Sequence, residues 1–180
     1  MTQRTLFWLL LLAMLGYAYL MKQNTVPLTG KEIVAYELAK TPDCANAMLR
    51  EFTTAGKIDL VRKSLYLDFV FLLLYGSALF VGCRYATELA RQVGIQPAWV
   101  RIGHGLSWLG IVALVADAIE NVALLRQLPP NAVTVLTAQV AWAMALLKFV
   151  SIIVVFLATL IAFGYYAIKR FSAPTEHRVG

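Results

Sequence analysis

Four long apolar stretches, separated by polar loops, dominate the pattern of the chain. They cover residues 6–21, 65–83, 102–125 and 132–168. A helix of about 20 residues crosses the hydrocarbon core of a bilayer, and each stretch is close to this length or longer. The pattern predicts an all-α fold, a four-helix transmembrane bundle with both termini on one side of the membrane.

The fourth stretch is longer than one membrane span requires. As a single helix, its roughly 37 residues would extend about 55 Å, almost twice the hydrocarbon thickness. We therefore expect it to cross the membrane at about residues 147–168, while residues 132–146 project beyond the membrane beside the first loop. Asn131, which follows a pair of prolines, is the expected N-cap of this helix.

The first loop has the pattern of a short helical extracytoplasmic cap over residues 29–63. Thr29 and Glu32 have the spacing of a capping box, which predicts a helix from Gly30 to about Lys40. Such a cap either lies on the mouth of the bundle or on the bilayer surface, or it offers a docking surface to a protein partner. The remaining alternative is that it only joins two spans.

A second cap helix is expected to begin after Thr41, with Pro42 in its first turn, and to stop at Gly56. Its apolar residues recur at i, i+3, i+4 and i+7 and form one stripe: Ala45, Met48, Leu49 and Phe52. Residues 57–64 keep an apolar side, so we expect them to run straight into the second span.

Composition supports the membrane interpretation. The chain is 60% apolar and 14% charged, whereas soluble domains are about 45–50% apolar and about a quarter charged. Its net charge of +6 raises the question of nucleic acid. However, Lys and Arg residues stand at the ends of the apolar segments, as membrane insertion requires. We therefore expect membrane lipids as partners and no nucleic acid.

The same charges favour an orientation with both termini in the cytoplasm. The terminal side concentrates its Lys and Arg residues in shorter segments, which carry more weight than long loops. Arg4 followed by a leucine-rich helix is typical of an uncleaved signal anchor, because no small-residue cleavage site follows it. We predict a multi-pass protein of the bacterial cytoplasmic (inner) membrane, with Cys44 outside and Cys83 at the inner end of the second span.

Four ionisable residues interrupt the apolar spans: Asp68, Asp117, Glu120 and Lys148. A charge at the centre of a bilayer costs at least about 2.5 kcal/mol and ordinarily faces the bundle interior for a functional reason. Counting from the inner basic boundaries, at about 1.5 Å per residue, puts all four at depths of roughly 24–31 Å. The sequence therefore predicts one polar layer in the outer leaflet, built by three helices.

Two more polar residues are expected in this layer. Asn121 shares one helix face with Asp117 and Glu120, and Tyr75 lies two turns below Asp68 on the same side. Further along, the face of Asp117 has only small residues, which let a neighbouring helix approach closely: Gly103, Ser107, Gly110 and Ala113. We predict a ligand-binding site made of six residues: Asp68, Tyr75, Asp117, Glu120, Asn121 and Lys148.

The predicted layer has too much negative charge for a buried site. Three carboxylates and one lysine give a formal charge of −2, which cannot persist at low dielectric with every group ionised. Either some carboxyls hold a proton, or Arg62, Lys63 or Arg126 fold in from the rim, or a cation or basic ligand occupies the site. A metal at this site would have to be a hard cation, since only oxygen ligands and an amide are present. We expect neither a permanent metal nor a cofactor.

Several motifs occur in order along residues 31–148: Glu37-Leu-Ala-Lys, Asp68-Phe-Val-Phe, Tyr75-Gly76, Ala116-Asp117-x-x-Glu120-Asn121 and Lys148. Together they resemble a pattern found in an uncharacterised group of small bacterial four-helix integral membrane proteins. That resemblance implies no assigned activity. A looser, fold-level analogy is to the EXPERA group of sterol isomerases and ligand-binding membrane proteins, which also place acidic residues in a four-helix bundle.

These features favour a non-enzymatic protein whose acidic pocket binds a lipid, an amphiphilic amine or a cation. One alternative is an enzyme that uses one carboxyl as general acid and another carboxylate as base on a hydrophobic substrate. Another is a structural subunit whose polar layer joins the helices while its cap docks onto another protein. The sequence leaves open whether any reaction is catalysed.

Overall fold

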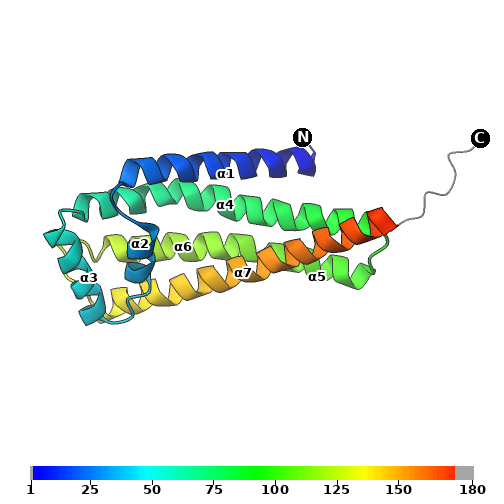
Figure 1. Ribbon diagram of the computed structural model, residues 1–180. Helices are drawn as coiled ribbons and strands as arrows, with labels where there is room; N and C mark the ends of the chain where they lie inside the picture. The colour runs from blue at the N-terminus through cyan, green and yellow to red at the C-terminus, as the bar shows by residue number, and fades with distance from the viewer. Residues whose placement is uncertain (1, 173–180) are drawn as a thin grey trace, which may run out of the picture.

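The computed structural model describes residues 2–172, and this part of the chain is helical and contains no strand. Its helices are α1 (Gln3–Thr25), α2 (Gly30–Glu37), α3 (Pro42–Thr54), α4 (Ile58–Gln92), α5 (Pro97–Ser107), α6 (Leu109–Leu125) and α7 (Val135–Ser172). Figure 1 shows a long bundle, with the start of α1 and the end of α7 at one end and the short helices α2 and α3 at the other. The predicted all-α four-helix bundle is confirmed.

Four helical segments are long and apolar enough to cross a membrane: Gln3–Thr25, Ile58–Gln92, Pro97–Leu125 and Val135–Ser172. The first two extend beyond the predicted apolar stretches at both ends, because the polar flanking residues continue the same helix. The third extends only at its start, and the fourth begins at Val135, three residues later than predicted, and ends four residues later. The third stretch, expected as one helix, consists of α5 and α6. The chain tightens between them, where Trp108 O accepts hydrogen bonds from the amides of both Ile111 and Val112.

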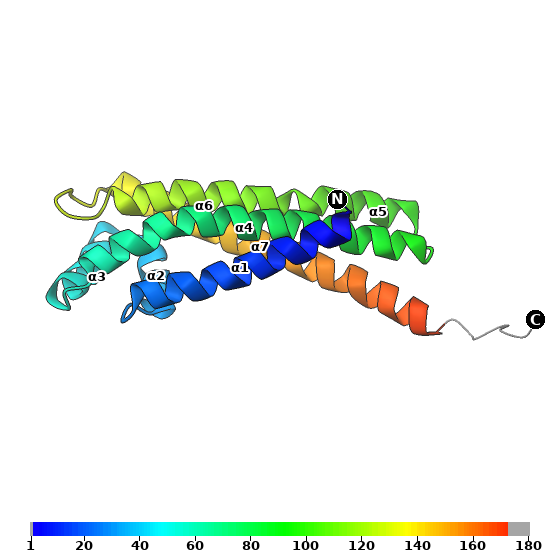
Figure 2. The ribbon, with the colours of Figure 1, turned by 90° about the horizontal axis from the view of Figure 1, so that it is seen from above.

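Helix α4 is central to the bundle and packs against α1, α6 and α7. Figures 1 and 2 both show α1 along the outer side of α4. Tyr17 of α1 donates a hydrogen bond to Leu67 O of α4 at 2.9 Å. Much of the apolar surface of α1 is exposed, including Leu12 at 65%. This exposure fits a helix that faces lipid on most of its circumference.

The small-residue face of the third span allows α4 and α6 to approach closely. A Cβ atom added at Gly110 would lie 2.8 Å from the backbone N of Phe80 and 2.9 Å from Gly76 O. At Gly103, the nearest neighbour is the side chain of Thr87. The expected close approach is therefore confirmed, and glycine is required where the two backbones meet.

The capping box at α2 forms as expected. The Thr29 hydroxyl accepts from the Glu32 amide at 3.3 Å, and Glu32 Oε2 accepts from the Thr29 amide at 2.7 Å. Lys57, at the start of the second span, forms a 2.6 Å ion pair with Glu32. The hydrogen bonds from Lys57 and Thr29 lower the pKa of Glu32 to about 2. The helix ends at Glu37 rather than Lys40, because residues 38–41 form the turn that leads into α3.

Helix α3 begins after Thr41, whose hydroxyl accepts from the Cys44 amide at 3.3 Å, and the chain turns at Gly56 with φ of 64°. Its apolar stripe packs onto α2, α4 and α6 in one buried cluster that includes Tyr36, Phe52 and Leu124. The rings of Tyr36 and Phe52 meet edge to face at 5.9 Å. Helices α2 and α3, the cap helices, therefore lie on the mouth of the bundle.

Helix α7 is a single helix from Val135 to Ser172, as its length predicted. Its expected N-cap was wrong. The hydroxyl of Thr134, not the side chain of Asn131, accepts from the amide of Thr137 at 3.1 Å. The backbone of Asn131 belongs instead to the preceding turn, where its N–H bonds to Leu128 O.

Candidate functional site

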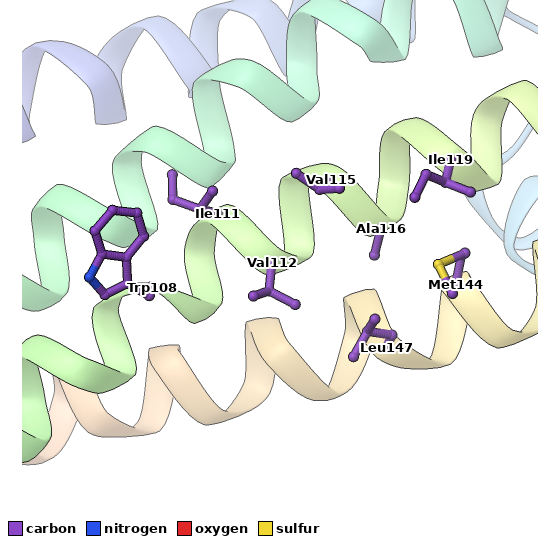
Figure 3. A pocket seen from close by; sticks show the side chains of 8 residues that line it. All are labelled: Trp108, Ile111, Val112, Val115, Ala116, Ile119, Met144 and Leu147. Carbon is purple, nitrogen blue, oxygen red and sulfur yellow. The ribbon is translucent and has the colours of Figure 1, made fainter.

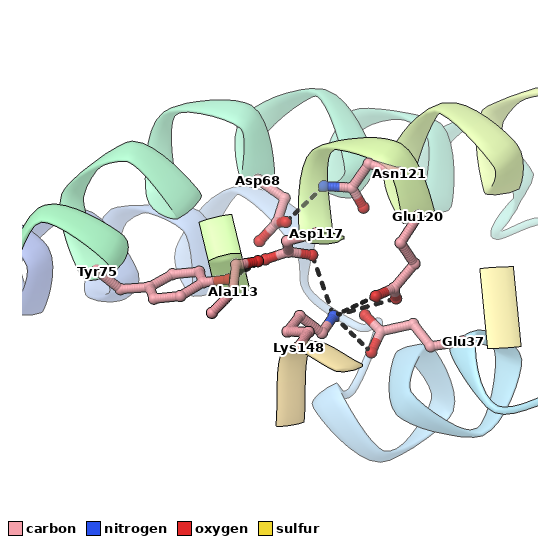
Figure 4. A network of polar contacts seen from close by, with 8 residues as sticks. All are labelled: Glu37, Asp68, Tyr75, Ala113, Asp117, Glu120, Asn121 and Lys148. Carbon is pink, nitrogen blue, oxygen red and sulfur yellow. Dashed lines mark hydrogen bonds and ion pairs between the residues drawn. The ribbon is translucent and has the colours of Figure 1, made fainter. Parts of the chain in front are cut away.

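Lys148 of α7 lies at the centre of the polar layer, among three carboxylates. Its Nζ donates to Asp117 Oδ1 at 3.1 Å, to Glu120 Oε1 at 3.0 Å and to Glu37 Oε2 at 3.2 Å. Asp117 and Glu120 belong to α6, whereas Glu37 is the last residue of α2 (Figure 4). All three donors of the ammonium group are used, so one side chain joins the cap to two spans.

These four side chains are almost fully removed from solvent. The exposed fraction is 5% for Lys148, 8% for Glu37, 3% for Asp117 and 0% for Glu120. Within residues 2–172, Glu120 Oε2 is buried without a hydrogen-bond partner, although it lies 2.9 Å from Lys148 Nζ. A carboxylate buried to this extent is destabilising unless its charge is compensated. The ionised form of Glu120 therefore depends on its contact with Lys148.

Tyr75 of α4 provides the second hydrogen bond to Asp117. Its hydroxyl donates to Asp117 Oδ2 at 2.7 Å and also lies 3.3 Å from Ala113 O. A hydroxyl has one proton, and the carboxylate of Asp117 is a stronger acceptor than the carbonyl of Ala113, so the proton is donated to Asp117. Asp117 therefore receives one hydrogen bond on each oxygen, from α4 on one side and from α7 on the other.

Asp68 and Asn121 form the second branch of the layer. Asn121 Nδ2 donates to Asp68 Oδ2 at 2.6 Å, which joins α6 to α4. Asn121 is 1% exposed. Asp68 is only partly buried, unlike the carboxylates around Lys148. One edge of the network is thus accessible at Asp68.

The structure brings all six predicted site residues into one region across α4, α6 and α7. Asp117, Glu120 and Lys148 contact one another directly, and the contacts of Tyr75 and Asn121 extend the layer to α4. The common depth obtained by counting residues along the spans is confirmed by these contacts. That the six residues bind a ligand stays a prediction.

Glu37 belongs to the polar layer but was not among the six predicted site residues. The depth of a residue can be counted only along a membrane span, and Glu37 lies in the first loop. The buried neighbour Tyr36, which fixes how α2 lies over the bundle, is recognised only from the structure.

A cleft of about 760 Å³ opens between the end of α1, the connection to α2, α2 itself and α4. Asp68 lies in its wall, together with Ser64 of α4, and exposed Lys22 stands in the α1 part of the wall. Most of the other lining side chains are apolar and include Met21, Val26, Leu28, Ile33, Val34 and Phe71. The α1–α2–α4 cleft is therefore a mostly apolar space that meets the polar layer at one carboxylate, that of Asp68.

With Glu37 added, the layer contains four carboxylates and one ammonium group, a formal charge of −3. The rim residues do not compensate for it. Arg62 donates to Pro129 O at 2.8 Å, and Lys63 donates to Asn24 at 3.1 Å. Arg126 is exposed. Protons or a bound cation remain as the sources of positive charge.

A second cavity, of about 280 Å³, lies between α6 and α7 (Figure 3). It is lined by apolar and aromatic side chains, among them Trp108, Ala116 and Leu147, and has no charged group in its wall. In residues 2–172 no group of three or more His, Cys, Asp or Glu side chains is arranged to hold a metal ion. Of these two cavities, the cleft beside Asp68 is the one that has a charged group of the polar layer in its wall.

Comparison with known proteins gives no matching family model, no matching curated sequence and no matching solved structure. The resemblances based on the motifs therefore stay predictions.

Proposed function

We propose that this multi-pass membrane protein binds an amphiphilic molecule in the α1–α2–α4 cleft, with the polar part of the ligand at Asp68. One observation carries the proposal. Asp68 lines the cleft, and its hydrogen bond with Asn121 makes it part of the polar layer. A ligand in the cleft therefore contacts the group through which the layer is accessible.

The size and chemistry of the cleft support an amphiphile. Its volume of about 760 Å³ falls within the range of about 300–1,000 Å³ that small-molecule sites occupy. The mostly apolar walls match an apolar body, while Asp68 and Ser64 supply the few polar contacts that fix orientation. Helix α1, which forms one wall, is otherwise exposed and packs mainly on α4. A ligand that enters from the bilayer between α1 and the cap helices therefore has a short path to the cleft.

The proposal includes a place in the cell. At the end of the bundle that holds the start of α1 and the end of α7, basic residues such as Arg4, Arg101 and Lys169 lie in short segments with few acidic residues to oppose them. The basic residues of the other end lie mostly in the long first loop. Positive charge at the ends of spans favours the cytoplasmic side. In this orientation the cleft belongs to the outer leaflet of a bacterial cytoplasmic membrane, and its ligand comes from that leaflet.

The test is ligand-induced thermal stabilisation of the purified protein in lipid nanodiscs, with membrane lipids and synthetic amphiphiles as probes. We expect stabilisation that is lost in Asp68→Asn and kept in Asp59→Asn, which neutralises an exposed carboxylate of the same helix outside the cleft. Stabilisation that is equal in both variants would reject the cleft as the binding site.

A structural role is the second candidate, and the contact between Lys148 and Glu37 favours it. This ion pair joins the cap to the bundle at 3.2 Å, and buried networks often serve packing alone. In that case no amphiphile stabilises the protein, and the protein co-purifies with a partner that binds to the cap.

An enzyme is the remaining alternative of the sequence analysis. It would be identified by a product that forms from membrane lipids in the presence of the parent protein and does not form with Asp68→Asn.

A further inference from the structure

We propose that the ligand of the α1–α2–α4 cleft is an organic cation, an amine or quaternary ammonium ion with an apolar body, and that it binds in exchange for a proton. The inference rests on the proposed function, because it names the chemical class that the same cleft accepts. It is carried by the charge of the layer, the engagement of the rim residues and the walls of the cleft.

The first step is the balance of charge. Glu37, Asp117 and Glu120 share the ammonium group of Lys148. Within residues 2–172, the one hydrogen bond to Asp68 comes from the neutral amide of Asn121 at Oδ2. Several unpaired carboxylates cannot remain ionised together at low dielectric. Without a ligand, the layer must hold protons on some of its carboxyls.

The second step is that neighbouring basic residues are committed elsewhere. Lys57 pairs with Glu32 at 2.6 Å. Arg62 donates to Pro129 O, and Lys63 donates to the side-chain oxygen of Asn24 in α1. Lys22 lines the cleft, but its side chain is exposed to solvent. The position beside Asp68 is therefore open to a positive charge that arrives from outside the chain.

The third step concerns the form of this cation. A hard metal ion needs six or more oxygen ligands, whereas the cleft is mostly apolar and offers Asp68 with a few hydroxyls. An organic cation needs one carboxylate for its charge and apolar walls for its body. Phe71, one turn from Asp68, adds a ring face of the kind that attracts ammonium groups.

Exchange follows from these steps. When the cation enters, a carboxylic acid of the layer becomes a carboxylate that pairs with it, and the proton leaves to solvent. One positive charge enters, one leaves, and no bond of the ligand changes. The titratable or charged groups around Asp68 are Tyr17 and Lys22 of α1, Glu37 of α2, Tyr75 of α4 itself, Asp117 of α6 and Lys148 of α7.

The experiment compares three probes with the same twelve-carbon chain: dodecyltrimethylammonium, dodecanol and dodecanoate. Binding to the full chain in nanodiscs is measured by titration calorimetry, with empty nanodiscs as the blank. Because a buried charge pair contributes more than a neutral contact, we expect the cation to bind at least about tenfold more tightly than either other probe. Titration in two buffers of different ionisation enthalpy should show up to one proton released per cation.

Three variants make the result specific. Asp68→Asn should lose both the tenfold preference and the proton release, while Asp59→Asn keeps both. Lys22→Gln does not touch the buried network, so it should fold as the parent protein does. Removing this positive charge from the wall should tighten binding of the cation about twofold or more and weaken binding of dodecanoate.

The possible outcomes test the ligand class, the proton exchange and the proposed function separately. Equal affinity for the three probes, sensitive to Asp68→Asn, would overturn the cationic class and leave the proposed function standing. Tight cation binding without proton release would overturn the exchange. Absence of binding by any of the three, in a protein that the lipids also fail to stabilise, would overturn the proposed function itself.

Discussion

At the scale of residues, Lys148 contributes one ammonium group to a layer that contains four carboxylates. It is 5% exposed and contacts three of them within 3.2 Å. The desolvation cost of each ion is offset only while these contacts are complete. The layer is therefore more sensitive to loss of this lysine than to loss of any single carboxylate.

We predict that Lys148→Met lowers the free energy of unfolding by about 3–5 kcal/mol, the cost of leaving buried charges without their partner. The measurement is reversible unfolding in mixed detergent micelles. Lys31→Met, which removes an exposed lysine from α2, serves as the control and should change little. If the two variants unfold alike, the carboxyls around Lys148 are already neutral and the layer is not held by ion pairs.

The residues of the layer show what a sequence can and cannot predict. Asp117, Glu120 and Asn121 share a helix face by spacing alone, and the helical rise fixes their depth. The contacts of Asp117 and Glu120 with Lys148, and of Asn121 with Asp68, were therefore predictable. Glu37 was not, because the position of a loop helix over a bundle depends on tertiary packing such as that of Tyr36 against Leu124. The cleft beside Asp68 depends on the placement of α1 and α2, which no local pattern encodes.

At the scale of helices, the apolar pattern predicted the number and type of spans but not their ends. Helices α4 and α7 continue past their apolar cores because the polar residues there still form helix. The division of the third span at Trp108 has no proline as a sequence signal; it follows from a local tightening of the backbone. The small-residue face, by contrast, was visible in the sequence and lies where α4 and α6 meet.

We predict that Gly110→Ala lowers the free energy of unfolding by about 1–3 kcal/mol, the usual cost of overpacking. The added methyl group would meet the backbone N of Phe80 at 2.8 Å, and backbone atoms cannot rotate away. Gly164→Ala in α7, with nothing within 4 Å of the new Cβ, is the matched control. Equal stability of the two variants in thermal denaturation would mean that α4 and α6 separate without cost.

At the scale of the whole molecule, the architecture separates two ends with different chemistry. At the end that holds the start of α1 and the end of α7, basic residues have few acidic residues beside them. The other end mixes basic and acidic residues and carries the cap helices, the cleft and the charged layer (Figures 1 and 2). The contact between Glu37 and Lys148 links the cap to the spans. Movement of α2 would therefore change both the wall of the cleft and the charge balance of the layer.

The orientation of these ends is testable with the two cysteines of the chain. Cys44 is exposed on α3, whereas Cys83 is buried in α4. If the cap faces outward, a membrane-impermeant maleimide should label Cys44 in intact bacterial cells that express the protein, and Cys44→Ser should abolish the labelling.

The reciprocal control introduces Gln92→Cys into the Cys44→Ser protein, because Gln92 is exposed at the opposite end of the bundle. This cysteine should react only after the membrane is permeabilised. The reverse pattern, with Gln92→Cys labelled in intact cells and Cys44 protected, would put the cap in the cytoplasm. The cleft would then open to the inner leaflet, and its ligand would have to come from the cytoplasmic side.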